Sequence, residues 1–155
     1  TPEGMAAEID RRLGLQSKGS MLPFAVIALD GPLTGKAVGM TTYMNIDATN
    51  RRVEIGSTWY RRAVQRSAVN TECKRLLLTH AFERLECLSV VFETSWFNFA
   101  SRTAIARLGA KQDGVLRNHK RHPDGTPRDT VIFSIIDAEW QGVKRHLQHR
   151  LDAHA

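Results

Sequence analysis

The most suggestive chemistry in this sequence lies in residues 65–74, a stretch of small and polar residues between a strand-like segment and a strong helical pattern. Asn70 and Thr71 are good N-cap residues, so we expect the helix to begin there. The free N–H groups and the dipole of a helix N-terminus bind anions, and Arg66 would add a full charge. The stretch therefore fits a pyrophosphate site. The alternative is an ordinary strand-to-helix connection, which every α/β protein contains.

A carboxylate lies on the strand just before this stretch. By the alternation of a strand, Glu54, Gly56 and Thr58 should share one face. A carboxylate in that position could accept a proton from a substrate, directly or through water. The alternative is a solvated or salt-bridged strand residue, paired with Arg52 or Arg61. Gly56 would allow a ligand to approach the backbone, or would serve only for packing.

Asn98 and Ser101 follow a later strand and lie one helical turn apart, so both could point toward one ligand. Either residue could instead cap the helix. His119 and His122 fall on opposite faces of a predicted strand, which disfavours shared metal ligation. We therefore assign no metal.

These residues need a scaffold, and the hydrophobic pattern predicts one with helices on both faces of a sheet. The expected helices span residues 1–13, ended by Gly14, a stretch of about fifteen residues after the loop, a segment opened by Asn98 or Ser101, and residues 138–151. The expected strands span residues 22–29, 36–46, 52–60, 88–94, 115–119 and 130–136. A strand-helix-strand unit requires strands 52–60 and 88–94 to pair in parallel, whereas hairpins make the other pairs antiparallel. The fold class is thus α/β (α+β), a mixed, mostly antiparallel twisted sheet in a single domain of residues 1–155.

The composition is that of an ordinary globular protein, with 42% hydrophobic and 25% charged residues. No apolar run approaches the length of a membrane span. The formal net charge of +6 favours anionic partners such as phosphates, a nucleotide cofactor, or acidic protein or RNA surfaces. Two cysteines, Cys73 and Cys87, do not form a disulfide framework, so we expect a cytoplasmic location. Because the chain starts at Thr1, we also expect processing or truncation at the N-terminus.

Six short motifs, in one order between Met40 and Trp140, resemble the GNAT superfamily of acetyl-CoA-dependent N-acetyltransferases. They resemble most closely the branch that acetylates ribosomal-protein N-termini and related amines. The motifs are Glu54-Ile55-Gly56 with Trp59, residues 65–74, Asn98-x-x-Ser101-Arg102, Arg107-Leu108-Gly109-Ala110, Gly114-Val115-Leu116-Arg117 and Asp124-Gly125-x-x-Arg128-Asp129.

The resemblance implies direct transfer of an acetyl group from acetyl-CoA to a primary amine, either a protein N-terminus or a small amine. Glu54 would be the base, and Ser101 would protonate the departing sulfur. Asn98 would contact the pantetheine amides, and splayed strands would offer backbone N–H groups to the thioester carbonyl. The implied cofactor-binding residues are Gly56, Ser57, Thr58, Gln65, Arg66, Ser67, Ala68, Val69, Asn70, Thr71, Asn98, Ser101 and Arg102.

Two features depart from the family pattern. Arg66 and Ala68 stand where relatives often have glycine, and we expect Ala68 at positive φ, at a cost of about 1 kcal/mol. We also expect this sequence to lack the first strand and helix of the family, which would leave a sheet edge unpaired. A second hypothesis is therefore a non-catalytic module that binds acyl-CoA, or RNA or a ribosome, although nucleic acid is the less expected partner. The acceptor and the oligomeric state stay open, with a homodimer as one candidate.

Overall fold

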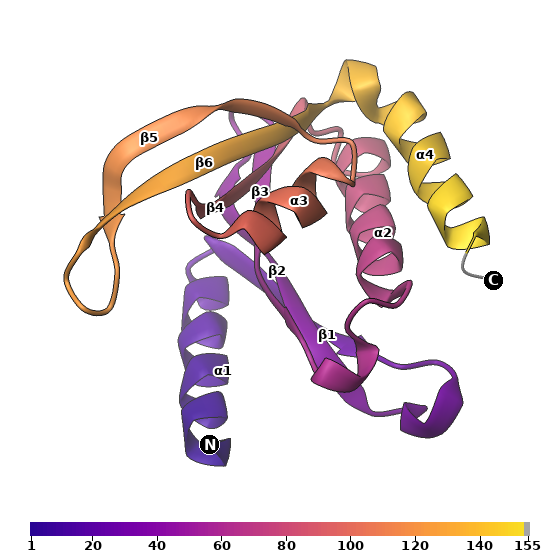
Figure 1. Ribbon diagram of the computed structural model, residues 1–155, viewed down its shortest axis with the longest axis horizontal. Helices are drawn as coiled ribbons and strands as arrows, with labels where there is room; N and C mark the ends of the chain where they lie inside the picture. The colour runs from indigo at the N-terminus through magenta and orange to yellow at the C-terminus, as the bar shows by residue number, and fades with distance from the viewer. Residues whose placement is uncertain (154–155) are drawn as a thin grey trace.

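Six strands form one open sheet in the computed structural model, which describes residues 1–153 (Figure 1). The strands are β1 (Met21–Ile27), β2 (Ala37–Asp47), β3 (Arg52–Tyr60), β4 (Ser89–Ser95), β5 (Lys111–Arg121) and β6 (Pro127–Ile136), in the order β1-β2-β3-β4-β6-β5. Every neighbouring pair is antiparallel except β3 and β4, which are parallel. The predicted mixed, mostly antiparallel sheet and its single parallel pair are confirmed.

Four helices cover the two faces of this sheet unequally. They are α1 (Pro2–Ser17), α2 (Val69–Glu83), α3 (Phe99–Ala106) and α4 (Trp140–Asp152). The Tyr43 hydroxyl of β2 donates to the Leu77 carbonyl of α2, whereas Thr42, on the other side of the strand, accepts from Arg12 of α1. We therefore refer to an α1 face and an α2 face, and α3 and α4 lie with α2 (Figure 1).

The main core fills the space between the sheet and the helices α2, α3 and α4. Leu78 of α2, Ile135 of β6 and Leu147 of α4 are fully buried there. Burial of each such side chain contributes roughly 1.5–3 kcal/mol to folding. Val53 of β3 and Val90 of β4 belong to this core at the point where the two strands pair.

The N-terminal helix differs from the sequence prediction. It does not end at Gly14 but continues to Ser17, and the first residue at positive φ after it is Gly19. The apolar residues Met5, Ile9 and Leu13, whose spacing predicted the helix, are exposed, and Arg12 is the buried residue. The strand β1, which follows this helix in the chain, lies at an edge of the sheet. Among residues 1–153, no helix has both the length and the apolar character required to cross a membrane.

Candidate active site

The parallel strands β3 and β4 pair over a short distance and then separate. Their ladder joins residues 52–54 of β3 to residues 89–91 of β4. A cavity of about 460 Å³ opens beside the point of separation. Its lining comes from β3, α2, β4, α3 and the turn after α3. It includes Ile55, Gly56, Ser57, Thr58, Tyr60, Asn70, Lys74, Phe92, Glu93, Ala100, Ser101, Ala104, Ile105 and Leu108. A cavity of this size is typical of a small-molecule site.

A bulge at Ser57 shapes the β3 wall of the cavity. Ser57 has a φ of 48°, and the register between β2 and β3 shifts here, so that Thr41 alone faces Ser57 and Thr58. The extra residue reverses the alternation of side chains. Glu54 and Gly56 lie on the α1 face, as predicted, but Thr58 lies on the α2 face. The prediction that Thr58 shares a face with Glu54 was wrong because a bulge cannot be read from regular alternation.

Glu54 is buried, with 6% of its surface exposed, and its Oε2 accepts a hydrogen bond of 2.6 Å from Asn45 Nδ2. Its hydrogen-bond partner is therefore an amide and not Arg52 or Arg61. Burial raises the pKa of the Glu54 carboxyl, and the charge of Glu93 raises it further. Glu54 lies behind the cavity wall rather than in the lining, so a water molecule or a movement is needed to connect it to a ligand.

Glu93 is a second carboxylate, which the sequence reasoning missed. It lies on β4, lines the cavity and forms an ion pair of 2.7 Å with Lys120 of β5. Strand alternation places it on the α1 face, because its neighbours Phe92 and Thr94 are the buried positions of β4. Its place as the one charged residue in segment 88–94 was the available signal.

The predicted phosphate loop has a different helix start from the expected one. α2 begins at Val69 with Ala68 as N-cap, so Asn70 and Thr71 lie in the first turn. Ser67 Oγ accepts from the Val69 N–H at 3.3 Å and sets this earlier start. Ala68 has a φ of −66° rather than a positive value, and Arg66 instead has a φ of 63°. The residue expected to be strained is therefore relaxed, and the left-handed position falls two residues earlier.

The first turn of α2 nevertheless retains the donors that an anion needs. By helix geometry, the N–H groups of Asn70 and Thr71 have no intrahelical acceptor. Ala68 provides no side-chain cap for them. Asn70 also lines the cavity, so this helix start and the space beside β3 are continuous. The arrangement fits an elongated ligand with an anionic group at one end.

The predicted site residues divide into two groups. Five of them line the cavity, namely Gly56, Ser57, Thr58, Asn70 and Ser101. The others lie outside the lining, namely Glu54, Gln65, Arg66, Ser67, Ala68, Val69, Thr71, Asn98 and Arg102. Gln65 donates to the Tyr60 carbonyl at 2.9 Å, and Arg102 lies over the Trp96 ring at 4.4 Å. Asn98 caps α3, because its side chain accepts from the Ser101 N–H at 3.0 Å.

Lys74 is a second charged residue of the cavity lining that the sequence reasoning missed. Only 5% of its surface is exposed, and its Nζ donates to Thr58 Oγ1 at 2.7 Å and to Thr41 Oγ1 at 3.0 Å. None of the ion pairs found within residues 1–153 includes Lys74. Burial without a carboxylate lowers the pKa of this ammonium to about 7. Within the same residues, no cluster of three or more His, Cys, Asp or Glu side chains could hold a metal ion.

Comparison with known proteins gives a consistent result. The acetyltransferase (GNAT) domain matches residues 1–111 of this chain. YdaF of Bacillus subtilis, a proposed ribosomal N-acetyltransferase, is 33% identical over 110 residues, which are 71% of this chain and 59% of YdaF. The match thus spans less than two thirds of the length of that relative.

Two solved structures are similar over nearly the whole chain. A proposed acetyltransferase from T. thermophilus is 33% identical with a TM-score of 0.84, covering 97% of this chain and 76% of that one. A GCN5-related N-acetyltransferase from Brucella melitensis is 34% identical with a TM-score of 0.82, covering 94% of this chain and 64% of that one.

Proposed function

Because this chain belongs to the GNAT acetyltransferase family, we propose that it transfers the acetyl group of acetyl-CoA to a primary amine. The observation that carries the proposal is the cavity at the separation of β3 and β4, which continues to the first turn of α2. An acyl donor with a pyrophosphate at one end and a thioester at the other matches these two features.

The fit to CoA is argued from the donors of this chain. The N–H groups of Asn70 and Thr71, with the charge of Arg66 nearby in the loop, would hold the pyrophosphate. The backbone of β3 at Gly56, together with Ser101 of α3, would flank the pantetheine arm. When bound, acetyl-CoA supplies an activated acyl group as a thioester.

The reaction then needs three proton transfers. Glu54, whose pKa is raised by burial and by Glu93, would take one proton from the ammonium form of the acceptor through water. The neutral nitrogen bonds to the thioester carbon, and the carbon–sulfur bond breaks. The nitrogen loses its second proton to water, and the sulfur leaves as a thiolate that takes a proton from water, either directly or through Ser101, which then regains a proton from water. The products are an N-acetylated amine and free CoA.

The acceptor that we infer is a cationic amine, with a protein N-terminus as the first candidate. Glu54 and Glu93 lie on the α1 face of β3 and β4, beside the separation of the strands, and because Glu93 is paired with Lys120, Glu54 is the carboxylate left for the amine. Acidic groups of this kind attract an ammonium ion. The similarity to YdaF, a proposed ribosomal N-acetyltransferase that is 33% identical, favours a ribosomal-protein N-terminus over a small amine as the acceptor.

A binding experiment tests the proposal before any acceptor is known. We expect acetyl-CoA at millimolar concentration to raise the Tm, whereas adenosine should not, because the contacts lie at the pyrophosphate and pantetheine. Acetyl-CoA binding should weaken only modestly between roughly 50 and 200 mM salt. No shift of Tm in a folded sample would remove the enzyme proposal.

An acceptor screen then separates an enzyme from a binding module. Peptides with free N-termini and a small diamine should be compared by mass spectrometry for gain of one acetyl group. Acetyl-CoA binding without any turnover would favour a non-catalytic module. Binding of RNA that falls about a thousandfold over the same salt range would favour the RNA or ribosome alternative.

A further inference from the structure

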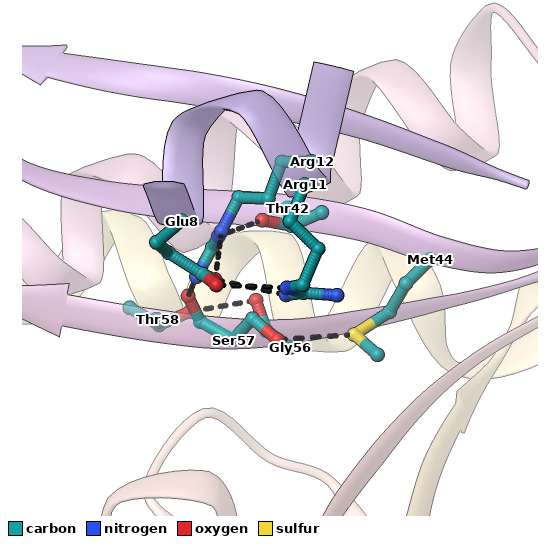
Figure 2. Close-up of polar contacts among 8 residues, drawn as sticks. All are labelled: Glu8, Arg11, Arg12, Thr42, Met44, Gly56, Ser57 and Thr58. Carbon is teal, nitrogen blue, oxygen red and sulfur yellow. Dashed lines mark hydrogen bonds and ion pairs between the residues drawn. The ribbon is translucent and has the colours of Figure 1, made fainter. Parts of the chain in front are cut away.

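Arg12 is a buried cation that belongs to α1 yet contacts the bulge of β3. Only 4% of its surface is exposed. Figure 2 shows its guanidinium between Glu8 of the same helix and the two strands beneath. A buried guanidinium is costly unless its N–H groups are paired, so the partners indicate what the residue does.

Each side of the guanidinium fork has a partner. Nε donates to Glu8 Oε1 at 2.7 Å, and Nη1 donates to Thr42 Oγ1 at 2.6 Å. Both Nη1 and Nη2 also donate to the Ser57 carbonyl, each at 3.2 Å (Figure 2). Bonds from Arg11 and Arg12 lower the pKa of Glu8 to about 2, so the anchor of this cluster stays ionised at neutral pH. Arg12 therefore holds one particular peptide, that between Ser57 and Thr58.

The geometry of that peptide links Arg12 to the cavity. No peptide bond among residues 1–153 is cis, and in a planar trans peptide the C=O and N–H point in opposite directions. The Ser57 carbonyl points toward Arg12 on the α1 face, so the Thr58 N–H points away from Arg12. Ser57 and Thr58 both line the cavity. A charge-assisted bond at the carbonyl also polarises the peptide and strengthens its N–H as a donor.

We propose that Arg12 is a positioning residue that fixes and polarises the Ser57–Thr58 peptide, so that the Thr58 N–H donates to the carbonyl oxygen of the acyl donor. This inference rests on the proposed acetyl transfer. Negative charge develops on that oxygen when an amine attacks a thioester, and a preorganised N–H lowers the barrier. Arg12 also stabilises the positive φ of Ser57, a conformation that a serine does not prefer.

The first test uses Arg12→Met, which keeps the apolar stem but removes the fork, and Thr42→Val as the matched control. Thr42→Val removes another Arg12 partner but leaves the bonds to Ser57. We expect Arg12→Met to lower kcat by roughly tenfold to a hundredfold, with KM for acetyl-CoA changed less than about threefold. Thr42→Val should change kcat less than about twofold. Equal losses of kcat in both variants would mean that Arg12 only holds α1 against the sheet, and would overturn the inference.

The second test does not depend on turnover and so distinguishes this inference from the proposed function. In ¹⁵N-labelled protein, Arg12→Met should shift the amide proton of Thr58 upfield and change its hydrogen exchange, whereas Thr42→Val should leave both near the wild-type values. An unchanged Thr58 amide in Arg12→Met would overturn the inference even in an active enzyme. A changed amide in a protein without acetyl transfer would instead refute the proposed function. If Arg12→Met does not fold, Arg12→Lys, which cannot bridge with two nitrogens, serves for both measurements.

Discussion

Burial shifts the pKa values of two residues in or just behind the cavity wall. The pKa of Glu54 is raised, and the pKa of Lys74 is lowered to about 7. Both groups thus titrate closer to neutral pH than they would in water. Such shifts are common at active sites, where a group must exchange protons in the working pH range.

We predict that Glu54→Gln lowers kcat by about a hundredfold and leaves the Kd of acetyl-CoA nearly unchanged. Glutamine keeps the size of Glu54 and can still accept from Asn45, but it cannot take a proton. In the wild type, kcat/KM should rise with pH through a midpoint above the ordinary carboxylate range, because the pKa is raised. Steady-state kinetics with a peptide acceptor would measure both. Equal losses in kcat and affinity would mean that Glu54 is structural.

Lys74 should make stability depend on pH. Its pKa is about 7 in the folded state and about 10.5 when unfolded, so the unfolded chain binds more protons between these values. The free energy of unfolding should therefore rise from about pH 7 to 8.5, by up to about 1.4 kcal/mol per pH unit from this group. Lys74→Met should remove that rise. Urea unfolding of both proteins at several pH values would measure the difference.

The window for this measurement stops at about pH 8.5 for a physical reason. Burial raises the pKa of the Cys73 and Cys87 thiols. When the pH exceeds the pKa of an ordinary thiol, these groups ionise more readily in the unfolded chain, so a further rise in pH favours the unfolded state. Below about pH 8.5 the difference between wild type and Lys74→Met reports on Lys74. Parallel stability curves for the two proteins in this window would contradict the lowered pKa.

Among the elements, α3 depends most on its cap because it has only eight residues. We predict that Asn98→Ala lowers the free energy of unfolding by about 0.5–2 kcal/mol, since the Ser101 N–H loses its acceptor. Asn98→Asp should keep the cap and the stability. If Asn98 also contacts the pantetheine amides, calorimetry should show weaker acetyl-CoA binding in Asn98→Asp despite the intact fold. Unchanged affinity in that variant would leave Asn98 as a cap alone.

The elements were predictable because regular periodicity and turn residues are local properties of the sequence. The run in residues 130–136 and the stripe of Trp140, Val143, Leu147 and Leu151 indicated β6 and α4. Most of these side chains are buried, but Ile136 is 41% exposed and Leu151 is only partly buried. Side chains that act across elements were less predictable. Lys74 reads as a surface lysine of an amphipathic helix, and its burial depends on Thr41 and Thr58 from two strands.

Within the candidate site, some of the predicted residues line one cavity, but the local backbone geometry differs from the prediction. Gly56, Ser57, Thr58, Asn70 and Ser101 do converge on the cavity. The positive φ expected at one loop residue occurs two residues earlier, and the bulge in β3 was not foreseen. Both features arise from contacts with other parts of the chain, which no local pattern encodes. The ligand contacts themselves stay predictions.

At the scale of the whole molecule, stability comes from the core between the sheet and α2, α3 and α4. We predict that Leu78→Ala lowers the free energy of unfolding by about 2–5 kcal/mol, because Leu78 is 0% exposed and its loss leaves a cavity. Leu76→Ala, two residues earlier on the same helix but 59% exposed, should change it by less than about 0.5 kcal/mol. Chemical denaturation of both variants checks the contrast. Similar losses in both would mean that the exposed side of α2 is covered in solution.

The extra residue in β3 has a consequence for how the strand can vary. Ser57 is one residue more than regular pairing with β2 requires. Side chains before it alternate between the two faces of the sheet in one phase, and side chains after it alternate in the opposite phase. Deleting it would turn the Thr58 hydroxyl away from Lys74 and move every following side chain of the strand to the opposite face. Residues 52–60 should therefore tolerate changes of residue type far better than a change of length by one.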